Sequence, residues 1–438
     1  MSIRCAYVPQ LLMPKEGTDL SKWAVVACDQ YTSQPEYWEE AEKIVGDAPS
    51  ALRLILPESN LESPDCSAYI DEIHAAMQKY MEDGTLVQLP AGVVLLARDT
   101  GGAAPRRGLV LAFDLDTYEY AAGSASPIRP TEKTVVERIP PRLKVREGAS
   151  VELPHIMLLI DDPERQIIEP LYERRAEFSK LYDVELMQGG GHLTGWYIPE
   201  GDETEKLLDK LAQLSNPAVF NKKYGITDNR AVLPYAVGDG NHSMATAKAY
   251  WEAIKATIPP EEWENHPARF VLAEVVNIHD ESIVIEGIYR ALFHVDAVDV
   301  LDAAKNFFGA HGAEVTITES VPVALPEGVQ SFPFMAGTRT GYMVLQHSKW
   351  ALPVAALQAF LDDYLAAHPA VKIDYIHGLD VLHELAAQPD SMGFELPNPA
   401  KEDLFRGVIF DGVLPRKTFS MGDAREKRFY MEARKIVK

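Results

Sequence analysis

The segment Leu233–Lys255, "LPYAVGDGNHSMATAKAYWEAIK", changes character twice within a few residues. Its first part is an apolar run typical of a buried strand, and the run ends in Gly238–Ser243. The alanine-rich remainder has helical spacing, and we expect this helix to begin near His242 or Ser243. The segment therefore predicts a strand, a tight turn and a helix, the repeating unit of proteins that mix sheets and helices.

The turn between this strand and helix has two interpretations. Asn, Asp and Ser are preferred N-caps and Gly is common in turns, so capping alone explains the residue types. Alternatively, the first N–H groups of the helix bind an anion, and Gly238 and Gly240 let the backbone approach it closely. In that case His242 supplies a charged donor or a proton-transfer group, and Asp239 holds Mg²⁺ or orients His242. The turn matches neither G-x-x-x-x-G-K-[ST] nor G-x-G-x-x-G.

Strand and helix patterns alternate along the rest of the chain. We therefore expect an α/β to α+β protein with mixed sheets, packed helices and two to three closely associated domains. These are an N-terminal α/β domain over residues 1–120, a central domain with the basic loop and the turn over 121–280, and a C-terminal α+β domain over 281–438. Strands are predicted at Trp23–Asp29 and Leu52–Pro57, helices at Pro35–Val45, Glu164–Leu181, Val298–Phe308 and Leu352–Ala367, and a hairpin around Gly189–Gly191. Glu286 and Arg290 are predicted to share a helix and to pair there.

Composition narrows the class of protein. The 438 residues include 42 Lys and Arg against 65 Asp and Glu, which gives a net charge of −23 and repels nucleic acid. Basic residues nevertheless gather in Ile128–Arg146 and in the last 24 or so residues, a pattern that fits a small anionic ligand. The chain has three cysteines, no CxxC pair, no apolar run of about 18 residues and no secretory start. We therefore expect a cytoplasmic protein without a membrane partner.

Several polar residues outside the turn are predicted to serve the same site. Asp29 closes a predicted strand, a common position for a ligand-facing carboxylate, and Glu36 begins a helix, where acids are favoured anyway. Either is a predicted base if a hydroxyl must be deprotonated, and Asp29 has a turn or cap role as its alternative. Four basic residues are predicted to neutralise a phosphate or else to balance local acids: Arg129, Lys133, Arg138 and Arg142.

Four segments, taken in order, resemble the bacterial and archaeal family catalogued as domain of unknown function 1015. "WAVVACDQYTSQPEYW" resembles its N-terminal strand and loop, and "RPTEKTVVERIPPRLKVREGA" resembles its "HPHEKT…DR" segment. "YAVGDGNHSMATAKAYWE" resembles its "DGHHRYETA" turn, and "NIHDESIVIEGIYRAL" resembles its "glvilPTHRv" region. The likeness covers most of the chain. It departs at Asn241 and Ser243, which stand where the family has His and Arg.

The turn is also similar to the signature loops of the ParB and sulfiredoxin superfamily, to which free serine kinases belong. This resemblance implies a ParB/sulfiredoxin-like part of the fold and a helix N-terminus that binds nucleotide phosphates. It implies phosphate contacts by Gly238, Gly240, Asn241 and Ser243, with Mg²⁺ and ATP or ADP as cofactors. The family's association with serine-biosynthesis enzymes points to serine or phosphoserine as the small metabolite.

Three functions follow as hypotheses. The first is a phosphotransferase or phosphohydrolase of a small metabolite, with His242, Asp239, Asp29 and Glu36 as catalytic candidates. The second is a protein that binds and senses a nucleotide without catalysis. The third is a ParB-like protein associated with nucleic acid, against which the net charge and the lack of a helix-turn-helix pattern argue.

Overall fold

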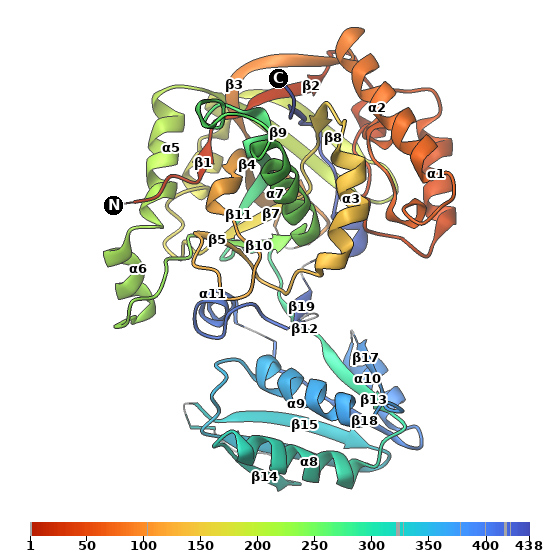
Figure 1. Ribbon diagram of the computed structural model, residues 1–438, viewed down its shortest axis with the longest axis vertical. Coiled ribbons are helices and arrows are strands. Elements are labelled where there is room, and N and C mark those ends of the chain that lie inside the picture. The colour runs from red at the N-terminus through yellow and green to blue at the C-terminus, as the bar shows by residue number, and fades with distance from the viewer. Residues whose placement is uncertain are drawn as a thin grey trace. The chain divides into compact units, whose positions relative to one another are not determined.

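The chain forms two structural units, and its C-terminal segment belongs to the same unit as its N-terminal part. The computed structural model describes residues 2–438 except 103, 321–324, 327, 377, 399, 416–417 and 421. Unit 1 comprises Met1–Pro130, Thr134–Val284 and Gly422–Lys438, and unit 2 comprises Thr131–Lys133 and Ile285–Met421 (Figure 1). Each unit has its own sheet and its own helices.

Unit 1 is built on a mixed ten-stranded sheet with the order β5-β10-β7-β11-β4-β3-β9-β8, onto which β1 pairs at β4 and β2 at β3. Near the turn, β10 runs parallel to β5 and antiparallel to β7, and β7 runs parallel to β11. A separate pair joins β6 and β20. The strands are β1 (Ala6–Tyr7), β2 (Gln10–Pro14), β3 (Leu86–Asp99), β4 (Arg106–Asp114), β5 (Ile128–Pro130), β6 (Val151–Glu152), β7 (Met157–Ile160), β8 (Ser179–Leu186), β9 (Gly191–Pro199), β10 (Tyr235–Asp239), β11 (Phe270–Asn277) and β20 (Arg434–Lys435).

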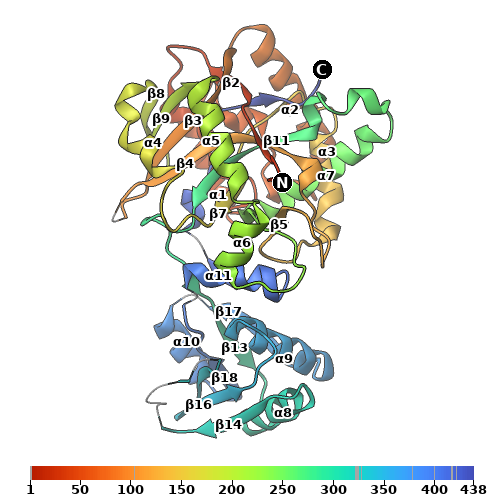
Figure 2. The same cartoon turned by 90° about the vertical axis from the view of Figure 1, so that its left-hand side faces the viewer.

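The helices of unit 1 include the two that flank the predicted site. They are α1 (Pro35–Val45), α2 (Cys66–Glu82), α3 (Ile139–Arg146), α4 (Glu169–Glu173), α5 (Asp202–Gln213), α6 (Pro217–Tyr224) and α7 (Asn241–Lys255). α3 packs beside α7, as both views show (Figures 1 and 2). The basic segment Ile128–Arg146, predicted to be a loop, contains a short strand and a helix that packs against α7.

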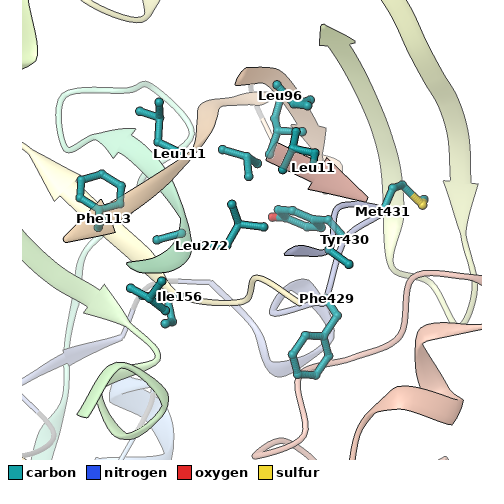
Figure 3. Close-up of a cluster of buried hydrophobic side chains, with 14 of the residues drawn as sticks. Leu11, Leu96, Leu111, Phe113, Ile156, Leu272, Phe429, Tyr430 and Met431 are labelled. Carbon is teal, nitrogen blue, oxygen red and sulfur yellow. The ribbon is translucent and has the colours of Figure 1, made fainter. Parts of the chain in front are cut away.

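The C-terminal segment completes the core of unit 1. Leu12 and Ala433 exchange backbone hydrogen bonds of 2.7 and 2.8 Å, and the Phe429 N–H donates to the Val25 carbonyl at 2.9 Å. Phe429, Tyr430 and Met431 are buried among side chains that include Leu11, Leu96, Leu111, Phe113, Ile156 and Leu272 (Figure 3). This core therefore joins residues that lie about 400 positions apart in the sequence.

A buried polar network crosses the same core. Arg106 donates to both carboxylate oxygens of Glu274 at 3.3 and 3.1 Å and to the Tyr430 hydroxyl at 2.6 Å. Beside it, Glu432 is fully buried and accepts a hydrogen bond of 2.6 Å from the Tyr182 hydroxyl. Burial, opposed by the Tyr182 hydrogen bond, raises the pKa of Glu432 to about 7. The core thus holds an acid that is largely protonated below neutral pH.

Unit 2 is built on an antiparallel six-stranded sheet with the order β14-β16-β15-β18-β13-β17. A separate antiparallel pair joins β12 and β19. Its strands are β12 (Glu286–Gly287), β13 (Tyr289–Phe293), β14 (Glu314–Thr318), β15 (Gln330–Ala336), β16 (Arg339–Gln346), β17 (Lys372–Ile376), β18 (Ser391–Phe394) and β19 (Phe419–Ser420). Its helices are α8 (Ala297–Ala310), α9 (Pro353–Ala367), α10 (Leu379–Ala386) and α11 (Lys401–Phe410).

The predicted mixture of sheets and packed helices is confirmed, and several elements match closely. The helix predicted at Pro35–Val45 is α1, and those predicted at Val298–Phe308 and Leu352–Ala367 correspond to α8 and α9. The hairpin predicted around Gly189–Gly191 is formed by β8 and β9. These elements have strong local periodicity or turn signals, which is why the sequence alone located them.

Four predicted elements are wrong. Trp23–Asp29 contains a buried apolar run but no strand; it forms only an isolated β-bridge between Val26 and Arg428. Its backbone pairs with the irregular C-terminal segment instead of with a strand of a sheet. Leu52–Pro57 starts in a 3-10 turn, Ala51–Leu54, which the Ser50 side chain caps. The long helix predicted at Glu164–Leu181 shrinks to α4, since the chain from Ser179 pairs as β8 with β9. Glu286 and Arg290 lie on strands, not on a common helix.

Candidate functional site

The turn lies between the end of β10 at Asp239 and the start of α7 at Asn241 (Figure 1). Gly240 has a left-handed backbone, with φ of 76°, and a Cβ built there would lie 3.0 Å from the Cα of Ile156. Only glycine fits both the conformation and the space without a shift of the neighbouring backbone. The turn is therefore held tightly against the residue that precedes β7.

No side-chain hydrogen bond caps α7 among the described residues. The first helical bond runs from the Met244 N–H to the Gly240 carbonyl at 2.9 Å, and the N–H groups of Asn241, His242 and Ser243 donate to no described residue. The Oδ1 atom of Asn241 is buried and also lacks a described partner. Side-chain capping therefore does not explain why these residue types occur in the turn.

Ser243 is joined to a histidine that the sequence analysis did not single out. Its hydroxyl lies 2.8 Å from Nε2 of His155, which comes two residues before β7, and the ring of His155 packs edge-on against Phe429. The other ring nitrogen, Nδ1, is buried without a described partner. Ser243 and His155 thus form a polar pair between the helix N-terminus and the core.

His242 is held as a neutral ring. Burial, reinforced by Arg142 and Arg138 and opposed by Asp29, lowers the pKa of His242 to about 4. Its Nε2 accepts a hydrogen bond of 3.3 Å from the Val135 N–H, so the ring proton sits on Nδ1. The charged-donor role suggested for His242 therefore does not fit this ring near neutral pH.

Two carboxylates and a lysine lie beside the turn. Oδ1 of Asp239 accepts from the Gly240 N–H at 2.9 Å, and its Oδ2 is 3.3 Å from Nζ of Lys427. The atoms packed around Asp29 raise the pKa of its carboxyl, but His155, a 2.9 Å hydrogen bond from Gln30 and the charge of Lys427 outweigh this effect. The pKa of Asp29 is therefore lowered, and its carboxylate is ionised at neutral pH.

The predicted basic residues separate into different environments. Arg138 is exposed, while Arg142 donates from Nε to Oε1 of Glu58 at 2.7 Å, and both act electrostatically on His242. The Arg129 guanidinium donates at 3.3–3.4 Å to the carbonyls of Ser124, Ala231 and Val232, and burial lowers its pKa to about 10. Because residues 231–232 precede β10 and the turn follows it, Arg129 is directed away from the turn.

The remaining two predicted residues are exposed and are not connected to the turn by a described contact. Lys133 belongs to unit 2, and Glu36 lies in the first turn of α1. Glu36 has no hydrogen bond or ion pair to a described residue of the cluster around His242. The structure thus brings together Asp29, Asp239, His242, Ser243 and the two arginines Arg138 and Arg142.

A cavity of about 150 Å³ adjoins this cluster. Ser243 and Thr246 of α7 line it, together with His155, Arg142 and Cys28. Burial and the charges of Asp29 and Glu58 raise the pKa of the Cys28 thiol well above its ordinary value, so it stays protonated. The arrangement places a helix end whose first N–H groups donate to no described residue, the ionised carboxylate of Asp29 and a small, partly open cavity together within unit 1.

Metal and membrane features are absent from the described part of the chain. No group of three or more His, Cys, Asp or Glu side chains there is arranged to hold a metal ion, and both oxygens of Asp239 already have partners. Among the same residues, none of the helices has the length and apolar character that a membrane crossing needs.

His155 and Lys427 are the members of the cluster that sequence reasoning missed. A single His before a buried strand carries no distinctive signal, and Lys427 is one of several basic residues near the C-terminus. Only the return of the C-terminal segment to unit 1 brings Lys427 to Asp239. The basic concentration at the C-terminus was the one available hint.

Comparison with known proteins gives a family and distant structural likenesses. The family described as "Protein of unknown function (DUF1015)" matches residues 12–380. A free serine kinase in complex with AMP is 11% identical, with a TM-score of 0.37, over 75% of this chain and 92% of that one. A conserved hypothetical protein from Pyrococcus furiosus is 12% identical, with a TM-score of 0.35, over 75% of this chain and 95% of that one. No curated protein matches. Because both TM-scores are below 0.5, nothing about this chain's chemistry follows from these likenesses.

Proposed function

We propose that this chain, which belongs to the family described as "Protein of unknown function (DUF1015)", binds a phosphate group at the N-terminus of α7 and transfers or hydrolyses it. The observation that carries the proposal is the set of unpaired N–H groups on Asn241, His242 and Ser243, at a helix end that no described side chain caps. Such groups, with the positive end of the helix dipole, form a common anion site. The buried Oδ1 of Asn241 adds an unpaired acceptor beside them, which is suited to a hydroxyl of the ligand rather than to its phosphate oxygens.

The charges around the turn suit a phosphorylated ligand. Phosphoryl transfer needs neutralised charge and positioning more than covalent chemistry. Exposed Arg138 and the nearby Lys427 supply positive charge, and the neutral ring of His242 supplies an Nδ1–H donor. In this proposal the ligand is a nucleotide such as ATP or ADP, or a small phosphorylated metabolite, with serine or phosphoserine suggested by the family resemblance.

Asp29 is the residue proposed to hold Mg²⁺ or to act as the base. It is ionised, Gln30 donates to its Oδ1, and its Oδ2 makes no hydrogen bond to a described residue. Mg²⁺ is commonly held by one or two carboxylates together with phosphate oxygens, so a site without three protein ligands fits this ion. When bound, the ion would neutralise phosphate charge. A free carboxylate at the same place is suited to accept the proton of an acceptor hydroxyl.

A ligand panel tests whether the turn binds phosphate. We expect at least one of ATP, ADP, CTP and phosphoserine, with or without Mg²⁺, to raise the melting temperature of the full chain. Ligand at about 100 times its dissociation constant adds ~2.7 kcal/mol of stability. If no phosphate-bearing compound shifts the transition, the proposal fails. A shift without turnover of any compound would favour the alternative, a nucleotide sensor.

Two variants separate the predicted bases. Asp29→Asn is expected to lower turnover by about 10²–10⁴-fold, the usual contribution of a general base, while nucleotide affinity changes much less. Glu36→Gln is the matched control, because Glu36 is exposed in α1 and has no described contact with the cluster. Equal losses in both variants, or a larger loss in Glu36→Gln, would remove Asp29 from this role.

A further inference from the structure

The cavity beside the turn has apolar walls. Leu54, Leu61 and Met77 come from the N-terminal segments, Val145 and Ala149 from the region of α3, and Leu272 from β11. Its volume of about 150 Å³ equals that of engineered apolar cavities that stay dry and bind benzene. A single ring is therefore a rigid group that this space takes without rearrangement.

The charged residues on the cavity wall already have partners. Arg142 is paired with Glu58, and Glu152 accepts hydrogen bonds from Arg434 at 3.0 and 2.7 Å and from the Leu272 N–H at 2.9 Å. The Thr246 hydroxyl donates to the His242 carbonyl at 2.7 Å. These pairings leave the wall with little capacity to compensate the charges of a zwitterion, which is costly to bury without partners.

Unpaired polar atoms remain at few places on the wall. Nδ1 of His155 and Nε of Arg146 are buried and lack a described partner, and both side chains line the cavity. The His155 ring also contacts the Ser243 hydroxyl at the N-terminus of α7. The cavity and the proposed phosphate position thus share one polar junction, formed by Ser243 and His155.

We infer that the cavity binds a single aromatic ring, or an alkyl group of equal size, on the same substrate whose phosphate binds at the turn. This inference rests on the proposed function and names its substrate class: a phosphorylated or phosphorylatable compound with an apolar body. It narrows that proposal, because the ammonium and carboxylate groups of serine or phosphoserine, which the family resemblance suggests, are unsuited to these walls. The apolar body is buried among aliphatic side chains, and the phosphate reaches the N–H groups of Asn241–Ser243.

The test compares phosphate compounds that differ in the organic group attached to the phosphate. Binding of benzyl phosphate, phosphoserine and inorganic phosphate to the full chain is measured by calorimetry, with benzyl alcohol as a probe that lacks the phosphate. We expect benzyl phosphate to bind at least about tenfold more tightly than the other two phosphates, since a buried ring contributes at least this factor. Benzyl alcohol is expected to raise the melting temperature and to compete with benzyl phosphate.

Two variants locate the ring. Leu61→Phe and Ala149→Val narrow the cavity and should each remove most of the advantage of benzyl phosphate while leaving inorganic phosphate affinity unchanged. Leu89→Phe is the matched control, because Leu89 is also half-buried against the core but does not line the cavity. The melting temperature of each unliganded variant reports whether it folds. If Leu61→Phe does not fold, the smaller change Ala149→Val still tests the inference.

The outcomes separate the two proposals. Equal affinities for benzyl phosphate and inorganic phosphate would overturn the inference and leave the phosphate site intact. An advantage that persists in both cavity variants would also overturn it, because the ring would then bind elsewhere. If benzyl alcohol binds in a cavity-dependent manner but no phosphate binds, the ring site stands and the proposed phosphate function fails.

Discussion

Gly240 and Gly225 have the same left-handed backbone but different surroundings. Their φ angles are 76° and 67°, yet a Cβ at Gly240 would meet the backbone of Ile156 at 3.0 Å, whereas one at Gly225 would meet nothing within 4 Å. The comparison separates the cost of the conformation from the cost of crowding at the turn. It also shows why glycine is required at the turn for two independent reasons.

Gly240→Ala is expected to destabilise unit 1 by about 2–3 kcal/mol, of which the left-handed conformation accounts for about 1–2 kcal/mol. Gly225→Ala is expected to cost about 1–2 kcal/mol, because only the conformation contributes. Urea unfolding of the two variants measures the difference. We also expect Gly240→Ala alone to weaken phosphate binding, and equal unfolding free energies in the two variants would contradict the crowding at Ile156.

Glu432 makes the stability of unit 1 depend on pH in a defined direction. Its folded-state pKa is raised to about 7, so the folded protein retains a proton that the unfolded chain loses from about pH 4.5 upward. The stability associated with this proton is present below pH 4.5 and is lost as the pH rises through 7. The carboxyl therefore opposes folding most strongly in mildly alkaline solution.

Glu432→Gln removes this titration and retains an acceptor for the Tyr182 hydroxyl. We expect the free energy of unfolding of the variant, minus that of the native chain, to be about 2 kcal/mol larger (the variant relatively more stable) at pH 8 than at pH 5. Denaturant unfolding at the two pH values measures this change. A difference that does not vary with pH would show that Glu432 is ionised in the folded core.

Individual residues also mark the limit of sequence reasoning at the site. The local string Gly238–Ser243 predicted a strand, a turn and a helix start, because all three are encoded within a few positions. Asp29 was chosen for its place after an apolar run, although that run is not a strand. His155 and Lys427 were not chosen, because their roles depend on contacts with Ser243 and Asp239 that lie 88 and 188 residues away.

At the scale of elements, the N-termini of α7 and α8 differ. The Asp296 side chain caps α8 by accepting from the N–H groups of Val298 and Asp299 at 2.7 and 3.2 Å. α7 has no such cap among the described residues, and the Asn241 side chain leaves Oδ1 buried and unpaired. One helix end is thus arranged for stability, and the other retains groups that a ligand can satisfy.

Substitution by alanine should therefore have opposite effects at the two ends. Asp296→Ala is expected to destabilise unit 2 by about 1 kcal/mol, the usual cost of a lost cap. Asn241→Ala is expected to leave the stability of unit 1 unchanged or to raise it by up to about 1 kcal/mol, since it removes an unsatisfied buried acceptor. Urea unfolding measures the stability of both variants, and calorimetry measures their binding of a phosphorylated ligand. We expect this binding to weaken only in Asn241→Ala. A stability loss in Asn241→Ala would restore the capping interpretation.

Elements whose signals are local were predicted, and those defined by distant partners were not. α1, α8 and the β8–β9 hairpin have amphipathic spacing or glycine turns that a short window reveals. Trp23–Asp29 reads as a strand in any short window, but its hydrogen-bonding partner begins near Lys427. The segment that follows α4 forms β8 because it pairs with β9, and no short-range sequence pattern predicts that pairing.

At the scale of the molecule, the division into two units predicts the form of thermal unfolding. The two units have separate sheets, and the proposed site lies wholly within unit 1. We expect two calorimetric transitions, of which a phosphate-bearing ligand raises only one. Gly240→Ala should lower that same transition, and Asp296→Ala should lower the other. A ligand that shifts both transitions equally would contradict this assignment.

The return of Gly422–Lys438 to unit 1 has a consequence for how the protein is made. During synthesis, β1 to β11 emerge first, but the segment that pairs with Val25 and carries Tyr430 into the core is not yet made. At about 5–20 residues per second, the ribosome needs on the order of ten seconds to translate unit 2 before it reaches that segment. Unit 2, which is nearly continuous in sequence, can fold during this interval. Unit 1 cannot complete its fold until residues 422–438 are made, and part of its apolar core stays exposed to solvent until then. Nascent chains arrested before residue 422 should therefore depend on chaperones far more than chains released after residue 438.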